Sequence, residues 1–128
     1  MRHDEERMQA DCVRWFGMQY HKLRRALVHV PNGGRRDARE GARFKRMGVQ
    51  AGVPDLLLFI PNGGYNGLAM ELKTPAGRLT KGQQEYRDIF RRCGWCYAVI
   101  RSFDEFMEAV NGYLESFMRR GEWGVLTE

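Results

Sequence analysis

Three charged residues interrupt two strand-like apolar segments of the sequence. Asp55 directly precedes the apolar run 56–60, and Glu71 and Lys73 end a second apolar segment that begins at Leu68. Side chains two residues apart on a strand share a face, so Glu71 and Lys73 are predicted to point the same way. A charged pair on an inner strand costs free energy unless it is used or solvated, so we interpret these residues as a functional site.

The predicted site combines two carboxylates with one lysine. If the strands that carry Asp55 and Glu71 form a hairpin, their carboxylates lie side by side and offer the oxygen ligands that Mg²⁺ prefers. The backbone carbonyl of Leu72 is expected to add a ligand. A divalent ion there would lower the pKa of water and neutralise charge on a phosphate, and Lys73 would stabilise negative charge in the transition state. The set is sufficient for phosphodiester hydrolysis.

The elements that must position this site are predicted in the order α-β-α-β-β-α-β-α. Strand-like segments lie at 26–30, 55–60, 68–73 and 95–100. Helical periodicity occurs at 5–20, 36–47, 81–93 and in the segment after Ser102. A mixed sheet flanked by helices, in one α/β domain spanning residues 1–128, is the expected fold.

Helix boundaries follow from local signals. Asp4 is the expected N-cap of the first helix, and Gly48 the expected left-handed residue after the second. Thr80-x-x-Gln83 and Ser102-x-x-Glu105 are both typical of capping boxes at helix starts. These signals predict that the third and fourth helices begin just after Thr80 and Ser102.

A series of short motifs surrounds the charged residues. They are Pro31-Asn32-Gly33-Gly34, the basic helix ending at Gly48, Ala51-Gly52-Val53-Pro54-Asp55, Met70-Glu71-Leu72-Lys73 and Leu79-Thr80-x-x-Gln83-x-x-Tyr86. In this order they resemble the VRR-NUC (virus-type replication-repair nuclease) family of the PD-(D/E)xK nuclease superfamily. The resemblance covers about residues 5–115. It implies a restriction-endonuclease-like core and a Mg²⁺- or Mn²⁺-dependent DNA endonuclease.

The resemblance also implies further residues and partners. Glu5 matches the family's glutamate on the first helix, expected as a catalytic residue and metal ligand, and Gln83 matches a family site residue, expected to be catalytic. Judged from the residues alone, the Gln83 side chain could instead serve only its capping box. Glu5 could likewise be only a first-turn carboxylate that the helix dipole favours. Stand-alone phage members of this size resemble Holliday-junction resolvases, which implies branched DNA as substrate, a role in DNA repair, a phage or prophage origin and a homodimer.

Positive charge is concentrated in one segment. The net charge is +5, and residues 22–46 carry nine basic and two acidic residues. Such a patch suits a polyanion, although a solvated helix face is the alternative. The residues expected to contact DNA are Asn32, Arg35, Arg36, Arg39, Arg43, Arg78 and Lys81.

The last helix is rich in apolar residues. They are Phe103, Phe106, Met107, Val110, Tyr113, Leu114, Phe117 and Met118. One helix against a thin sheet should not need so many, and exposed apolar patches often mark interfaces. The surplus therefore favours the homodimer, with a monomer whose last helix is buried in its own core as the alternative.

Other classes of protein fit less well. Cys93-Gly94-Trp95-Cys96 has the spacing of a redox motif, but Cys93 falls at an expected helix end and Cys96 enters an expected strand. We therefore expect reduced thiols, as in a cytoplasmic protein. The expected location is the cytoplasm of a bacterial host cell. No apolar run is long enough to span a bilayer. A non-catalytic DNA-binding module with the nuclease fold remains the alternative function. Sequence-specific restriction would need an added recognition region, for which the chain has little room.

Overall fold

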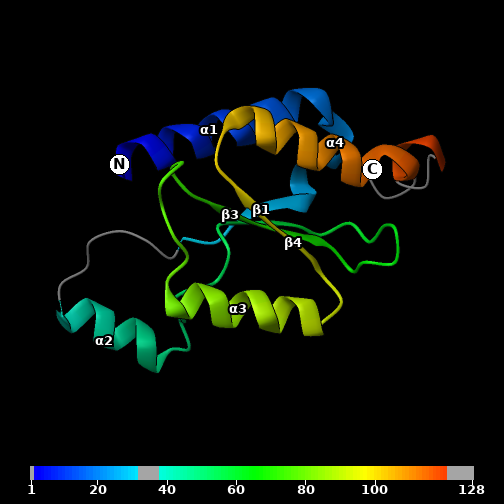
Figure 1. The fold of residues 1–128 in the computed structure, drawn as a ribbon. Coiled ribbons are helices and arrows are strands. Elements are labelled where there is room, and N and C mark those ends of the chain that lie inside the picture. The colour runs from blue at the N-terminus through cyan, green and yellow to red at the C-terminus, as the bar shows by residue number, and fades with distance from the viewer. Residues whose placement is uncertain (1, 32–37, 121–128) are drawn as a thin grey trace.

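A four-stranded sheet lies between two layers of helices in the computed structural model, which describes residues 2–31 and 38–120 (Figure 1). In chain order the elements are α1 (Arg2–Gln19), the 3₁₀ helix η1 (His21–Ala26), β1 (Leu27–His29), α2 (Ala38–Arg46), β2 (Leu56–Leu58), β3 (Leu68–Leu72), α3 (Lys81–Arg92), β4 (Cys96–Ile100) and α4 (Phe103–Arg120). The predicted α/β class and the order of helices and strands are therefore confirmed. None of the helices in the described ranges is long and apolar enough to cross a membrane.

The sheet is mixed, with strand order β1-β2-β3-β4. β2 pairs antiparallel with both β1 and β3, which confirms the predicted hairpin between the Asp55 and Glu71 strands. β3 and β4 pair in parallel, because the connection between them crosses over through α3. The three residues of β2 are all buried, as expected for an inner strand.

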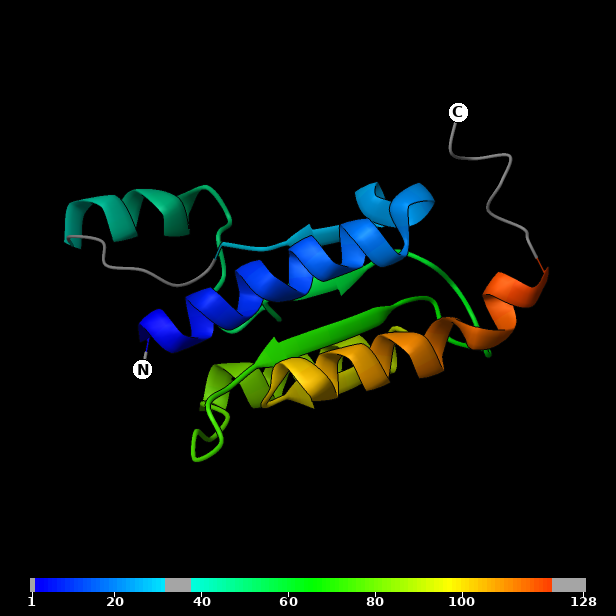
Figure 2. The same cartoon turned by 90° about the horizontal axis from the view of Figure 1, so that it is seen from above.

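The two faces of the sheet have different partners. α1 and α4 cover one face and α3 lies under the other (Figures 1 and 2). On β3, Leu68, Met70 and Leu72 belong to the apolar core, which also contains buried side chains of α1 and α4. Because side chains alternate along a strand, Ala69 and Glu71 face the α3 side. Glu71 therefore lies between the sheet and α3 and outside the main core.

Some predicted boundaries differ from the structure. The first helix already begins at Arg2, so Asp4 lies in its first turn and the prediction that Asp4 is the N-cap was wrong. η1 precedes β1 because Leu23 and Ala26 are buried against the core in a short 3₁₀ helix, which local periodicity did not indicate. The capping box at Thr80 is complete. At Ser102 only half of the box forms: the Ser102 hydroxyl accepts from the backbone N–H of Glu105 at 3.1 Å, but the Glu105 carboxylate accepts from the N–H of Arg101 at 2.8 Å and not from that of Ser102.

Most of the apolar side chains of α4 are buried in the protein's own core. Phe106, Val110 and Leu114 are fully buried and Phe117 is 4% exposed, whereas Met118 is 48% exposed. Trp15 of α1 packs edge-on against Phe106 at 5.9 Å between ring centroids. The surplus expected on this helix is therefore largely absent from its described surface. The homodimer stays a prediction that now rests on family resemblance.

Candidate active site

The candidate site lies at the sheet edge where β2 begins and β3 ends. Leu56 pairs with Met70, which sets Asp55 opposite Glu71 in the antiparallel register. The carboxylate of Asp55 accepts a hydrogen bond from the backbone N–H of Leu72 at 2.8 Å. The Asp55 carboxyl group also lies close enough to Glu71 to raise the pKa of the Glu71 carboxyl group. The hairpin thus brings Asp55 and Glu71 side by side, as their spacing predicted.

Glu71 carries an ionisable side chain that is almost fully buried. Its side chain is 2% exposed, and its Oε1 atom is buried with no hydrogen-bond partner among the described residues. Burial, then the hydrogen bond with Asp55 and the Asp55 charge, raise the pKa of Glu71 from 4.5 to about 9. Lys73 acts in the opposite direction, and the charge of Glu5 adds a smaller increase. A carboxyl group in this environment is neutral at pH 7 unless a cation stabilises its charge.

Gln83 contacts both Thr80 in its capping box and Glu71 in the carboxyl pair, with different atoms. Its Oε1 accepts from the backbone N–H of Thr80 at 2.9 Å, and its own backbone N–H donates to the Thr80 hydroxyl at 3.1 Å. Its Nε2 donates to Oε2 of Glu71 at 3.2 Å. The capping box therefore orients the amide so that its nitrogen faces the carboxyl group. The cap and the site contact do not compete, because they use opposite ends of one side chain.

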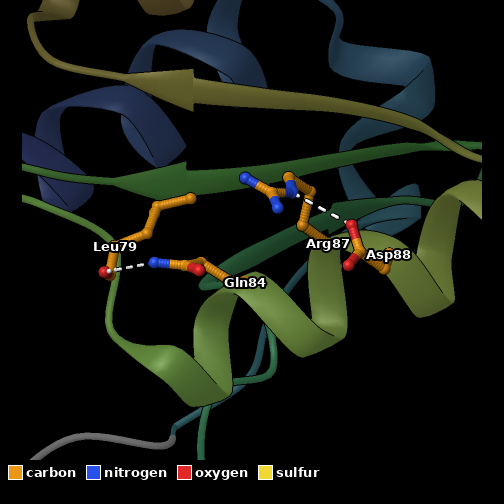
Figure 3. Close-up of polar contacts among 4 residues, drawn as sticks. All are labelled: Leu79, Gln84, Arg87 and Asp88. Carbon is orange, nitrogen blue, oxygen red and sulfur yellow. Dashed lines mark hydrogen bonds and ion pairs between the residues drawn. The ribbon is translucent and has the colours of Figure 1, made fainter.

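The first turns of α3 are fastened to the preceding loop. Gln84 donates through its side chain to the carbonyl of Leu79 at 3.2 Å, which ties the loop to the helix start (Figure 3). One turn further on, Arg87 extends from α3 toward the sheet and pairs with Asp88 at 3.2 Å (Figure 3). The Gln84 contact helps to hold the helix end from which Gln83 reaches Glu71.

Gly52 lets the loop before Asp55 approach α3. Its backbone is left-handed, with φ of +95°, and a Cβ atom there would lie 2.5 Å from the carbonyl carbon of Gly82 and 2.9 Å from the backbone nitrogen of Gln83. Both the conformation and the space exclude a side chain. Gly52 therefore brings the Asp55 loop and the Gln83 turn together.

Replacing Gly52 with alanine is expected to lower the free energy of unfolding by more than about 1–2 kcal/mol, the cost of the left-handed conformation alone. The clash with the Gly82 backbone adds to that cost. Urea unfolding followed by circular dichroism measures it. Gly112→Ala is the matched control: it lies within α4 with open space around it, and should stabilise by about 0.5–1 kcal/mol. Equal effects of the two substitutions would contradict this role of Gly52.

Lys73 and Glu5 meet across a cavity of about 360 Å³ at the same end of the molecule. The backbone N–H of Lys73 donates to the carbonyl of Ile100 at 2.9 Å, which extends the β3–β4 pairing past the strand. The cavity is lined by Asp4, Glu5, Met8, Lys73, Thr74, Pro75, Ala76 and Arg101. The first helix thus brings Glu5 near Lys73. Glu5 lies seven and eleven positions before the buried Cys12 and Phe16, so it projects on nearly the same side of α1.

The donor set fits a hard divalent cation better than zinc. In the described part of the chain no three His, Cys, Asp or Glu side chains converge as a ready ligand set. Closed zinc sites need four such ligands, whereas Mg²⁺ is held by one or two carboxylates with waters and substrate phosphate. Asp55 and Glu71 provide two carboxylates, and the partnerless Oε1 of Glu71 offers a free oxygen.

His29 is a neighbour of the site that sequence reasoning missed. Its Nδ1 lies 2.9 Å from the backbone oxygen of Asp55, which also accepts from the N–H of Val30 at 2.9 Å. With a carbonyl acceptor, Nδ1 is the protonated nitrogen. The sequence indicated no partner for this histidine because its contact is with a backbone atom 26 residues away.

The basic residues predicted to contact DNA are only partly described. Asn32, Arg35 and Arg36 lie outside the described residues. Arg39 and Arg43 are exposed on α2, and Arg78 and Lys81 are exposed beside the start of α3. α2 lies at the same end of the molecule as the N-terminus of α1 and the start of α3 (Figures 1 and 2). Positive charge is therefore available at the end where the carboxyl pair lies.

Neutralising Arg39 and Arg43 together is expected to weaken binding to all DNA sequences alike. If each contacts one phosphate, the slope of log affinity against log salt should fall by about 1.8, at roughly 0.9 per contact. Fluorescence anisotropy over a range of salt concentrations measures this slope. The control removes two exposed arginines elsewhere, Arg14 and Arg92, and should leave the slope unchanged. An identical slope in both double variants would show that α2 is only a solvated face.

Comparison with known proteins identifies a family and a solved structure that resemble this chain. The family model described as VRR-NUC domain matches residues 3–104. A solved structure described as a VRR_NUC domain protein is 30% identical, with a TM-score of 0.75, and the match covers 87% of this chain and 88% of that one. No curated protein matches the chain. Asp55, Glu71, Lys73 and Gln83 all fall within the matched segment.

Proposed function

This chain belongs to the VRR-NUC domain family, a family of DNA-processing nucleases, and from that membership we propose that it is a metal-dependent DNA endonuclease. The proposed catalytic residues are Asp55, Glu71, Lys73, Gln83 and Glu5. The proposed cofactor is Mg²⁺ or Mn²⁺, and the proposed reaction is hydrolysis of a phosphodiester bond.

The environment of Glu71 carries this proposal. A carboxyl group that is 2% exposed, raised in pKa by a neighbouring carboxyl group and left with one partnerless oxygen is costly for the fold. Ionisable groups whose pKa is strongly shifted by burial and by a neighbouring charge are typical of active sites. A purely structural residue at this position of β3 would be apolar, like its neighbours Met70 and Leu72. A cation at Asp55 and Glu71 would remove the repulsion and use the free oxygen.

The metal would be held by Asp55 and Glu71, with the carbonyl of Leu72 and the side chain of Glu5 as further proposed ligands. When bound, the ion supplies Lewis-acid chemistry: it neutralises charge on the phosphate and lowers the pKa of water. The protein's contribution is orientation. The Leu72 N–H fixes the Asp55 carboxylate, and the Gln83 amide holds Oε2 of Glu71. Oε1 is thereby left free for the ion.

Lys73 complements the carboxyl pair. Its ammonium group lies at the same sheet edge, and its charge lowers the pKa of Glu71. Beside a phosphate it would stabilise the negative charge that develops during hydrolysis. Electrostatic stabilisation by a held charge contributes most when the site excludes water, and the burial of Glu71 indicates such a site.

Branched DNA is the proposed substrate, and a homodimer is the proposed assembly. Exposed basic residues on α2 and beside α3 would follow phosphates around the site. Two sites related by two-fold symmetry would suit paired cuts in a four-way junction.

A substrate panel tests this part of the proposal. The protein is incubated with linear, flapped and four-way DNA of matched length and base composition, with Mg²⁺ or Mn²⁺, and with Asp55→Asn protein as the blank. Faster cleavage of the four-way junction than of the linear duplex is expected. Equal rates on all three substrates would refute the preference for branched DNA.

A further inference from the structure

We propose that Arg101 is a positioning residue: its guanidinium group holds the loop 74–77 and, through this loop, the side chain of Lys73. The inference rests on the proposed nuclease function, because it concerns how the proposed catalytic lysine is oriented. Arg101 is separated from Lys73 by 28 positions in the sequence and lies at the junction of β4 and α4.

The guanidinium group gathers the carbonyls of one short loop. Nη1 of Arg101 donates to the carbonyl oxygens of Gly77 at 2.6 Å, Thr74 at 2.9 Å and Pro75 at 3.3 Å. Hydrogen bonds from a charged donor are stronger than neutral ones, and here three acceptors share one nitrogen. A loop whose carbonyls turn inward onto a single cation depends on that cation for its shape.

The same loop covers the stem of Lys73. It begins at the residue after Lys73, and the N–H of Gly77 closes a turn onto the carbonyl of Thr74 at 3.0 Å. A Cβ atom on Gly77 would lie 3.4 Å from Cδ of Lys73, so the turn packs directly on the methylene chain. Release of the loop would therefore remove one wall from the lysine side chain.

The end of the Lys73 side chain has little other support. Lys73 lines the cavity of about 360 Å³ together with Arg101 and Glu5, so it faces open space on that side. A lysine side chain has about 2 kcal/mol of rotamer entropy, which must be overcome to hold its ammonium group in one place. The packed stem is the feature that can restrict it.

Arg101 is itself firmly held. Its backbone N–H donates to Oε1 of Glu105 at 2.8 Å, and the Glu105 N–H donates to the Ser102 hydroxyl at 3.1 Å. The start of α4 therefore fixes the backbone from which the guanidinium group reaches the loop. Arginine suits this position because its planar group offers several fixed donors, whereas lysine offers a compact charge.

Kinetics of Arg101 variants test the proposal. Arg101→Ala is expected to lower kcat on the DNA substrate by about 100-fold, the scale of a displacement of about 1 Å in a catalytic group. KM and the affinity for Mn²⁺ should stay at wild-type values, and added guanidinium ion should restore part of kcat. Arg24→Ala is the matched control, since Arg24 also donates to a backbone carbonyl, that of His21 at 2.8 Å, away from the site. Wild-type kcat in folded Arg101→Ala, or a loss confined to KM, would overturn the proposal.

A second readout does not depend on cleavage. The four lysines, Lys22, Lys45, Lys73 and Lys81, are dimethylated with ¹³C, and the Lys73 signal is assigned by its loss in Lys73→Arg. In Arg101→Ala, the Lys73 signal should become as narrow as the signals of the exposed lysines and move to their chemical shift. In Arg24→Ala, the Lys73 signal should not change. An unchanged Lys73 signal would overturn the positioning role even if the wild-type protein cleaves no DNA. If Arg101→Ala does not fold, Arg101→Lys is measured instead: reduced kcat with a shifted signal is expected, and wild-type values for both would overturn the proposal.

Discussion

Replacing Glu71 with glutamine is expected to lower the rate of DNA cleavage more than 100-fold and to weaken Mg²⁺ or Mn²⁺ binding. Removal of a residue that only orients a metal ligand typically costs about 10–100-fold, so loss of a proposed ligand should exceed that range. Glutamine keeps the size of the side chain and an oxygen for the Gln83 amide. The substitution therefore removes charge without creating a cavity in β3. Asp55→Asn should have the same two effects.

Comparing the effects of several variants on cleavage rate and on metal affinity is more informative than the loss of activity in any one variant. Lys73→Met should lower kcat strongly but leave metal affinity at or above the wild-type value, because it removes a positive charge from beside the ion. Cleavage rates and calorimetric titration with Mn²⁺ measure the two effects separately. Glu85→Gln, an exposed carboxylate on α3, is the matched control and should change neither. Wild-type cleavage by Glu71→Gln would refute the assigned role, as would wild-type metal affinity in that variant.

Without divalent ions, Glu71→Gln is expected to be more stable than the wild-type protein at pH 7–8. The folded-state pKa of Glu71 is about 9, against an ordinary value of 4.5, because of burial and of the Asp55 carboxyl group. Between these two pH values the folded chain holds a proton that the unfolded chain has released. Stability therefore falls as pH rises from about 4.5 to about 9. At pH 7, which is about 2.5 units above the ordinary value, the substitution should recover on the order of 3–4 kcal/mol, at about 1.4 kcal/mol per pH unit.

Urea unfolding in EDTA at several pH values measures this difference. The wild-type protein should lose stability between pH 5 and pH 9, and the curve of Glu71→Gln should be flatter. Glu85→Gln should follow the wild-type curve. Added Mg²⁺ should stabilise the wild-type protein more than Glu71→Gln, because a ligand that binds only the folded state raises its stability. A Glu71→Gln protein that is less stable than wild type at pH 8 in EDTA would contradict the account.

Much of the fold follows from local patterns. The continuous apolar run after Asp55 is typical of a strand buried on both faces. The alternation from Leu68 to Leu72 indicates which side chains enter the core, because it follows the two-residue repeat of a strand. The complete capping box at Thr80 was equally readable. The 3₁₀ helix η1 and the true start of α1 could not be predicted, since they depend on how Leu23, Ala26 and the first turn pack against distant elements. How much of the apolar surface of α4 stays exposed also depends on the elements that pack against it.

The proximity of Asp55 and Glu71 could be predicted from the sequence, whereas the other contacts around them could not. The spacing of Asp55 from Glu71 in a hairpin indicates that their carboxyl groups meet, and structure and sequence agree on that point. The two-ended use of Gln83 depends on the distance between α3 and β3, which no local pattern encodes. The contacts of His29 and Arg101 are with backbone carbonyls, so the residue type of the partner carries no signal.

The most direct test of the central claim is nicking of covalently closed circular DNA by the wild-type protein. A closed circle has no ends, so only an endonuclease converts it to the open or linear form. We expect conversion with Mg²⁺ or Mn²⁺, none in EDTA, recovery when excess Mg²⁺ is returned, and none at any metal concentration with Glu71→Gln. Conversion at an undiminished rate in EDTA, or by Glu71→Gln, would contradict a metal-dependent nuclease centred on Asp55 and Glu71.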